Sequence, residues 1–183
     1  MDGICVFAAS SMPRNRELIE AAERLGAYIA QRGHLFVYGG SQLGLMGVSR
    51  DAAKNAGGRV TGVIIEMFKR FATIDDVVVS DFPERLAKMR ELSKGVVCLA
   101  GGIGTFYEKS DVLQGAQLKR HQLPTVVINT AGYYDGFITQ FQRGIDEGLI
   151  PPDNGSFLHV VVRPEESVDF IESYVPRTIK DKV

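Results

Sequence analysis

The chain has 183 residues, a length that fits one domain with a sheet covered by helices on both faces. A formal net charge of -1 gives no electrostatic reason to expect binding to nucleic acid or to an anionic membrane. No stretch reaches the ~18 apolar residues of a membrane-spanning helix, and the apolar run after Met1-Asp2-Gly3 is too short for a secretion signal. Cys5 and Cys98 lie in apolar runs, as core residues do in a reducing compartment. We expect a cytoplasmic protein with a single domain over residues 1–183.

Short apolar runs alternate with amphipathic segments along the chain. The apolar runs predict strands at 4–8, 35–38, 60–65, 77–79, 95–99, 124–128 and 158–162. The segments between them predict helices over 18–29, 46–55 and 84–94, then from Thr105 onward, around 137–145, and over about ten residues near the end. The loop at 68–73 and the tail after Pro176 are expected to be the least constrained parts. Such alternation predicts an α/β fold, a doubly wound, Rossmann-like, mostly parallel sheet with helices on both faces.

A glycine-rich loop follows the predicted central strand, at the end of a parallel sheet where ligands bind. Gly101, Gly102, Ile103, Gly104 and Thr105 run directly from that strand into a helix. Glycines let successive N–H groups turn into one concavity, and the start of a helix adds free donors and a partial positive charge. The loop is therefore predicted to bind a phosphate, the alternative being a tight turn with Thr105 as the helix cap. No lysine follows it and the dinucleotide spacing is absent, so neither a Walker loop nor hydride transfer is indicated.

A second glycine-rich loop at 39–47 also ends a strand and opens a helix. Gly39, Gly40 and Ser41 are expected to face the ligand. Gly47 would lie inside the helix, where glycine costs about 1 kcal/mol relative to alanine. Close approach of either a ligand or a neighbouring helix would justify that cost, and the sequence leaves both possibilities open.

Two charged residues are placed near these loops. Glu108 lies one turn into the helix after the first loop, where a carboxylate either suits the helix start or has a task such as stabilising a developing cation or positioning water. Arg85 opens the preceding helix, and Met89 lies four residues further on the same face. Arg85 can reach a ribose, a phosphate or Glu108. Alternatively, it is a solvated arginine that pairs with Glu84 or Asp81.

Four segments together resemble the LONELY GUY family of cytokinin riboside 5′-monophosphate phosphoribohydrolases, which are often labelled lysine decarboxylases. The family segment G-G-x-x-x-G-L-M-G is matched at Gly39–Gly47, and M-H-E-R-K-A-x-M is partly matched at Phe82–Met89. The segment P-G-G-x-G-T-x-x-E is matched from Gly101 to Glu108, and Gly132–Gly136 is similar to a further family segment. The resemblance extends from about residue 6 to residue 150.

The resemblance implies cleavage of the N-glycosidic bond of an adenine-type nucleoside 5′-monophosphate, which gives a free base and ribose 5-phosphate. Residues at the positions of Arg85 and Glu108 are the family's catalytic pair. The glycine loop would anchor the phosphate, while Ser10, Met89 and Thr105 would complete the wall of the pocket. The family relationship also implies a homodimer, which agrees with apolar side chains on several faces of the helix after Thr105.

The chain departs from the family pattern at four positions. Ala100 replaces a proline and Ala9 a glycine, and Pro83 and Leu86 replace a histidine and a lysine. The first two changes alter the loops and the last two remove a positive charge, so the identity of the base stays open.

Two other functions compete with this prediction. One is a carrier without chemistry, such as a nucleotide or molybdenum-cofactor carrier protein. The other is a deoxyribosyltransferase-like enzyme, whose substrates lack the phosphate that the glycine loop suits. No cofactor is expected, since nothing marks a pyridoxal phosphate site. No metal is expected either, because His34, His121 and His159 are scattered along the chain.

Overall fold

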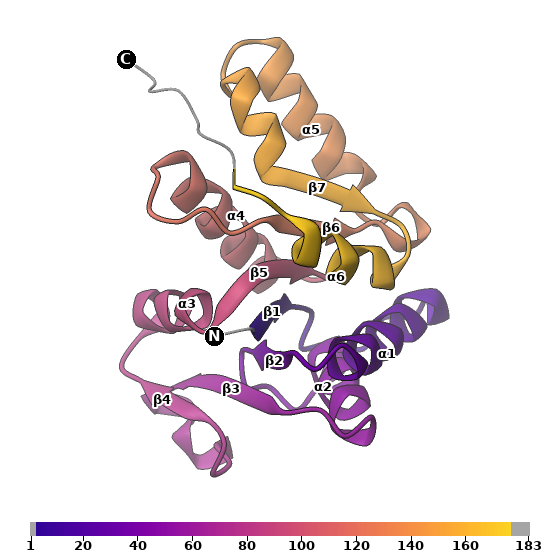
Figure 1. Ribbon diagram of the computed structural model, residues 1–183, viewed down its shortest axis with the longest axis vertical. Coiled ribbons are helices and arrows are strands. Elements are labelled where there is room, and N and C mark those ends of the chain that lie inside the picture. Colours follow the sequence, from indigo (N-terminus) through magenta and orange to yellow (C-terminus); the bar gives the residue numbers. More distant parts are fainter. Residues whose placement is uncertain (1–2, 177–183) are drawn as a thin grey trace.

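A seven-stranded, fully parallel sheet forms the centre of the protein in the computed structural model, which describes residues 3–176 (Figure 1). The strands lie in the order β4-β3-β2-β1-β5-β6-β7. Their bounds are β1 Gly3–Phe7, β2 Leu35–Tyr38, β3 Val60–Ile65, β4 Val77–Val79, β5 Ser93–Cys98, β6 Thr125–Ile128 and β7 Leu158–Val161. The chain starts at β1, moves outward to β4 and returns to β5 on the other side, so the strand order reverses between β1 and β5. The predicted α/β fold is confirmed, whereas the prediction for the tail after Pro176 lies outside the described residues.

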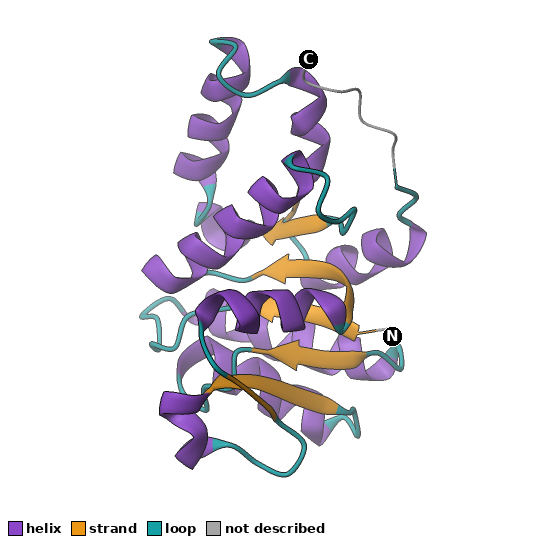
Figure 2. Ribbon diagram, turned by 90° about the vertical axis from the view of Figure 1, so that its left-hand side faces the viewer, coloured by secondary structure: helices purple, strands orange, loops and turns teal. Residues whose placement is uncertain are grey.

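In the described part of the chain, six α-helices cover the two faces of the sheet (Figure 2). They are α1 Arg16–Gln31, α2 Gly44–Asn55, α3 Phe82–Glu91, α4 Ile103–Gln117, α5 Asp135–Asp146 and α6 Pro164–Ser173. Helices α1, α2 and α6 pack on one face, and α3, α4 and α5 pack on the other. Three short 3-10 helices lie between them: η1 Glu66–Phe71, η2 Thr130–Gly132 and η3 Pro152–Phe157. Within the described residues, no helix combines the length and the apolar character needed to cross a membrane.

Two predicted helix boundaries were wrong. The third helix ends at Glu91, and Lys94 belongs to β5 rather than to the helix. Helix α4 begins at Ile103, with Gly102 in the capping position, so Thr105 is inside the first turn and does not cap it. The loop expected at 68–73 overlaps η1.

Local sequence explains where α1 begins and ends. Asn15 caps the helix, its side-chain oxygen accepting a hydrogen bond from the N–H of Glu17 at 2.9 Å. Gly33 ends it in a left-handed conformation with φ of 78°, which glycine adopts without a steric penalty. Between these residues, apolar side chains at helical spacing, from Leu18 to Ile29, are buried against the sheet.

Candidate active site

A cavity of about 880 Å³ lies beyond the carboxyl ends of the central strands, next to the point where the strand order reverses. Six segments form its wall: the loop at 8–11 after β1, the loop at 39–43, the first turn of α2, the end of β3 with η1, the first turns of α3, and the start of α4. These segments come from distant parts of the sequence, and the parallel topology brings their ends to one edge of the sheet. The sequence placed the ligand at this edge.

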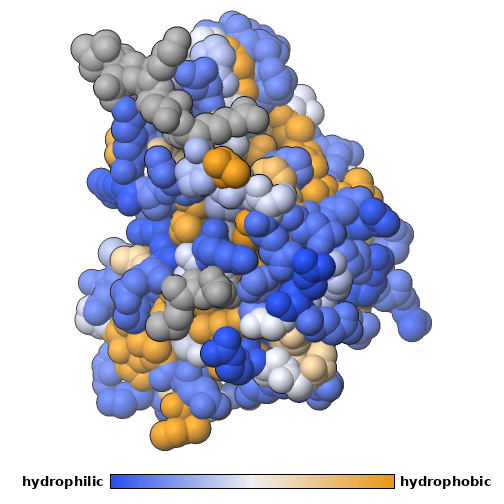
Figure 3. All heavy atoms as spheres, in the orientation of Figure 1, coloured by the Kyte–Doolittle hydropathy of each residue, from blue (hydrophilic) through white to orange (hydrophobic). Residues whose placement is uncertain are grey.

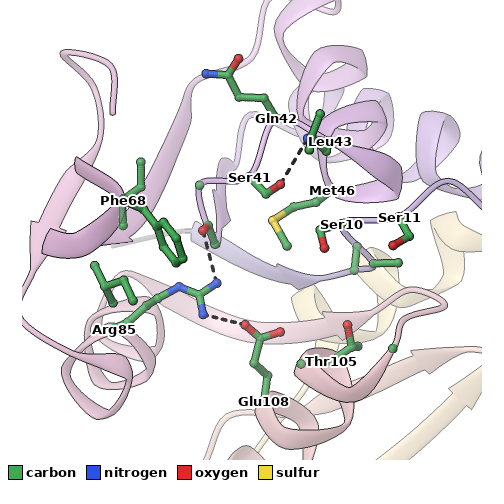
Figure 4. Close-up of a pocket in the computed structure, with 18 of the residues that line it drawn as sticks. Ser10, Ser11, Ser41, Gln42, Leu43, Met46, Phe68, Arg85, Thr105 and Glu108 are labelled. Atoms are coloured by element: carbon green, nitrogen blue, oxygen red, sulfur yellow. Dashed lines mark hydrogen bonds and ion pairs between the residues drawn. The ribbon is translucent and has the colours of Figure 1, made fainter. Parts of the chain in front are cut away.

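Arg85 and Glu108 form a buried ion pair on the floor of the cavity (Figure 4). Arg85 Nη1 lies 3.0 Å from Glu108 Oε1, and the two residues are 8% and 5% exposed. The guanidinium also donates from Nε to the carbonyl of Val63 at 3.0 Å and from Nη2 to the carbonyl of Gly39 at 3.3 Å. A side chain at Gly39 would place its Cβ 1.8 Å from Nη2, so this glycine admits the guanidinium.

The alternative pairing of Arg85 with nearby acids is not observed. Asp81 caps α3 by accepting a hydrogen bond from the N–H of Glu84 at 2.8 Å. The carboxylate of Glu84 accepts hydrogen bonds from the N–H and the hydroxyl of Ser80, at 2.8 and 2.6 Å. Of the possibilities that the sequence left open, the structure shows the contact between Arg85 and Glu108.

Burial and charge act in opposite directions on Glu108. Burial raises the pKa of its carboxyl group, and the adjacent Arg85 guanidinium lowers it, with burial the larger effect. The net pKa is therefore above the ordinary value for a glutamate. A carboxyl group in this setting is suited to proton transfer or to stabilising a positive charge that develops on a bound ligand.

The glycine loop presents the start of α4 to the cavity. Gly102, Ile103, Gly104 and Thr105 line it, and no side chain caps the helix at Gly102. The first N–H groups of a helix have no partner within the helix, so they are available to an anion. Gly101 lies behind the wall, where a Cβ would be 2.1 Å from the hydroxyl oxygen of Thr105.

The second glycine loop closes the opposite side of the cavity, and Gly39, Gly40 and Ser41 all line it. Gly40 has φ of 82°, and a Cβ there would lie 2.2 Å from Cγ1 of Ile64. Gly47 is explained by neither of the two possibilities left open, because a Cβ would lie 2.2 Å from the carbonyl oxygen of Gln42 in its own loop. Glycine at 47 lets the loop fold back on α2.

Ser10 lines the cavity as expected, but Met89 does not. Met89 is fully buried in the core between α3 and the sheet. It lies one helical turn beyond Arg85, about 6 Å further along the helix axis, and this distance moves it from the edge of the sheet to its face.

Sequence reasoning missed an apolar wall of the cavity. The apolar side chains that it did not single out include those of Met46, Phe68, Phe71 and Phe82. Phe68, Phe71 and Phe82 are 43–50% exposed. Figure 3 shows apolar atoms at the bottom of the molecule, the end that carries β3 and β4 in Figure 1. Several phenylalanines in a segment expected to be a loop were the pattern that could have indicated this wall.

Known proteins resemble this chain over most of its length. The family model described as "Possible lysine decarboxylase" matches residues 46–171. A cytokinin riboside 5′-monophosphate phosphoribohydrolase of Arabidopsis thaliana is 35% identical over 179 residues, which cover 95% of this chain and 84% of the relative. A probable cytokinin riboside 5′-monophosphate phosphoribohydrolase of Oryza sativa subsp. japonica is 36% identical over 181 residues, covering 94% and 78%.

Solved structures support the fold. The molybdenum cofactor carrier protein of Chlamydomonas reinhardtii superposes with a TM-score of 0.66 at 20% identity, covering 94% of this chain and 97% of the carrier. The molybdenum cofactor binding protein of the phototrophic bacterium Rippkaea orientalis gives a TM-score of 0.68, again at 20% identity and with the same coverage. At this level of identity the likeness concerns the fold alone.

Proposed function

The chain belongs to the LONELY GUY family, and from this membership we propose that it hydrolyses the N-glycosidic bond of an adenine-type nucleoside 5′-monophosphate. The products are the free base and ribose 5-phosphate. The observation that carries this proposal is the buried pair of Arg85 and Glu108 beside the glycine loop in one cavity. This arrangement supports a ligand whose phosphate binds at the glycine loop while its sugar lies near the carboxylate.

The reaction breaks the bond between C1′ of the ribose and the base nitrogen, and a water oxygen then bonds to C1′. One proton of that water ends on the departing base. The sugar becomes oxocarbenium-like as the base departs, and the Glu108 carboxylate stabilises that positive charge or orients the water. Arg85 opposes the effect of burial on the pKa of Glu108, which favours the carboxylate form, and holds the ribose or the leaving base.

The phosphate contributes by fixing the position of the sugar. Bound at the N–H groups of Gly102 to Thr105, it anchors the end of the substrate that does not react. Binding energy from this remote group places C1′ over Glu108 and favours the transition state. The apolar wall of Met46, Phe68, Phe71 and Phe82 is left to receive the base.

We also propose that the chain forms a homodimer through α3 and α4, the helices that carry Arg85 and Glu108. Several apolar side chains of α4 and its end are exposed, from 46% for Phe106 to 85% for Ile103. Such a surface is typical of a helix that packs against another chain. The mass of the protein in solution tests this proposal, and a monomeric mass would contradict it.

The activity is tested by incubating the protein with a panel of nucleoside 5′-monophosphates and measuring released base. Glu108→Gln is expected to lower base release by at least about 100-fold while ribose 5-phosphate still binds. Glu147→Gln is the matched control, because it breaks the exposed pair between Arg143 and Glu147 and is expected to leave base release unchanged. The absence of base release by the wild-type protein from every nucleotide would overturn the proposal.

A further inference from the structure

Two tyrosines hold the backbone of the glycine loop from behind. The hydroxyl of Tyr133 donates a hydrogen bond to the carbonyl of Gly101. The hydroxyl of Tyr134 donates to the carbonyl of Leu99 at 2.7 Å. Both tyrosines belong to the segment Gly132–Gly136. This segment is similar to a family segment, but the similarity assigns it no function.

The loop depends on such outside support. Gly102 caps α4 without a side-chain hydrogen bond, and a Cβ at Gly102 or Gly104 would meet no atom within 4 Å. The remaining carbonyls of the loop also have donors: Ala100 accepts from the N–H of Ala9 at 3.1 Å, and Gly102 accepts from the N–H of Phe106 at 3.0 Å. Four successive carbonyls, from residue 99 to residue 102, are thus hydrogen-bonded to the protein.

Holding a carbonyl also fixes the direction of the next N–H group. In a trans peptide the C=O and the N–H point to opposite sides of the chain. The hydrogen bond from Tyr133 therefore sets the direction of the Gly102 N–H, and the bond from Tyr134 sets that of the Ala100 N–H. Gly102 lines the cavity and caps α4, so its N–H lies next to the unpaired donors at the start of that helix.

The turn that carries the tyrosines is itself fixed. Ala131 and Gly132 both have positive φ, 53° and 69°, and a non-glycine residue in this region is strained. Asn129 braces the turn, since its side-chain oxygen accepts from the N–H of Tyr134 and its amide donates to Asp135, both at 2.7 Å. The strained turn is held by these hydrogen bonds, and it directs the hydroxyl groups of Tyr133 and Tyr134 at the glycine loop.

A second contact ties Tyr134 to the helix that bears Glu108. The ammonium group of Lys109 lies 4.6 Å from the ring centroid of Tyr134 and 3.1 Å from that of Phe137. Lys109 and Tyr134 are 2% and 1% exposed. The start of α5 is therefore packed directly beneath the first turns of α4.

We propose that Tyr133 and Tyr134 are positioning residues that orient the glycine loop for the 5′-phosphate of the substrate, a role that rests on the proposed function of that loop. The hydroxyl of Tyr133 fixes the peptide that carries the Gly102 N–H at the start of α4, and that of Tyr134 fixes the end of the strand from which the loop departs. The loop is thereby arranged before the ligand arrives. Phosphate affinity then depends on two hydroxyl groups that do not touch the phosphate.

The test is the dissociation constant of ribose 5-phosphate, measured by calorimetry for Tyr133→Phe and Tyr134→Phe. Each variant is expected to bind it about threefold to tenfold more weakly, the size of one lost hydrogen bond. Tyr28→Phe is the matched control, because it removes a hydroxyl that donates to Asp169 at 2.8 Å on the far side of the sheet. Its affinity is expected to equal that of the wild type.

Further readouts separate positioning from a loss of folding. Tyr133 is 41% exposed, so Tyr133→Phe is expected to fold. If Tyr134→Phe fails to fold, the affinity of Tyr133→Phe for ribose 5-phosphate alone tests the positioning role. In both variants kcat/KM is expected to fall for the nucleoside monophosphate and to stay constant for the nucleoside without phosphate. Wild-type affinity for ribose 5-phosphate in both variants would overturn the inference, as would an absence of binding to the wild-type protein. Binding of ribose 5-phosphate without any base release would instead overturn the proposed hydrolysis and leave the positioning role standing.

Discussion

Replacing Arg85 with glutamine would leave the Glu108 carboxylate buried without its counter-ion. Their atoms are 3.0 Å apart, and the side chains are only 10% and 6% exposed. Removing one partner of a buried ion pair destabilises a protein by about 3–5 kcal/mol, because the remaining charge is uncompensated. We expect Arg85→Gln to lower the free energy of unfolding by this amount at neutral pH.

The loss is expected to depend on pH with a defined sign. Burial raises the pKa of Glu108 in the folded protein, and Arg85 opposes this rise, so removing Arg85 raises the pKa further. A carboxyl group with a folded-state pKa above its unfolded value favours the folded state in acid, and this stability is lost as the pH rises through the folded-state pKa. The difference between wild type and variant should therefore be largest at neutral pH and shrink as the pH falls.

Urea denaturation at several pH values would measure this difference for Arg85→Gln, Glu108→Gln and the double variant. In the Glu108→Gln background no carboxylate is left unpaired. There Arg85 is the buried charge without a counter-ion, so the second substitution removes that charge together with the hydrogen bonds to Val63 and Gly39. Its cost should therefore be smaller than in the wild-type background and the same at every pH. A cost of Arg85→Gln that is the same in both backgrounds, or that does not shrink in acid, would refute the reasoning.

Three further outcomes are expected. Burial lowers the pKa of Lys109 to about 8, so between about pH 8 and about pH 10.4 only the unfolded state keeps this lysine protonated. The free energy of unfolding of the wild type should therefore rise with pH in that range, and Lys109→Met should abolish the rise. Chemical denaturation at several pH values measures the effect. Gly40→Ala should lower the free energy of unfolding by about 1–3 kcal/mol because of its positive φ, whereas Gly136→Ala, with open space around it, should not destabilise. Phe68→Ala should reduce the preference for a base with an apolar substituent over adenine by about tenfold in kcat/KM, and an unchanged ratio would show that the base does not contact this wall.

The strands could be predicted from the sequence because each buried strand is a short apolar run between polar segments. Helix boundaries were less certain where two patterns overlap. The amphipathic pattern of α3 continues past Glu91, but Ser93 and Lys94 belong to β5 instead. Thr105 is a common capping residue, yet Gly102 takes the capping position, three residues before the predicted start at Thr105.

The site could be predicted only in part, since the residues that meet there come from separate helices. The glycine loops and Glu108 follow from motifs next to strand ends. The contact between Arg85 and Glu108 depends on how α3 and α4 lie on the same face of the sheet, and the sequence left it as one of several possibilities. The apolar wall escaped prediction because η1 has no periodic pattern that fixes its position over the cavity.

Within residues 3–176, the cavity has a charged end at Arg85 and Glu108 and an end without a charged side chain at the glycine loop. Arg85 is the one cationic side chain among the described residues that line the cavity, and it is already engaged by Glu108 and two backbone carbonyls. The family lysine at position 86 is replaced by Leu86, which is buried in the core. A bound phosphate would therefore depend on backbone N–H groups and hydroxyls rather than on a neutralising side chain. Donors of this kind bind an anion well only when their directions are fixed in advance, which is why the backbone of the glycine loop needs support from behind.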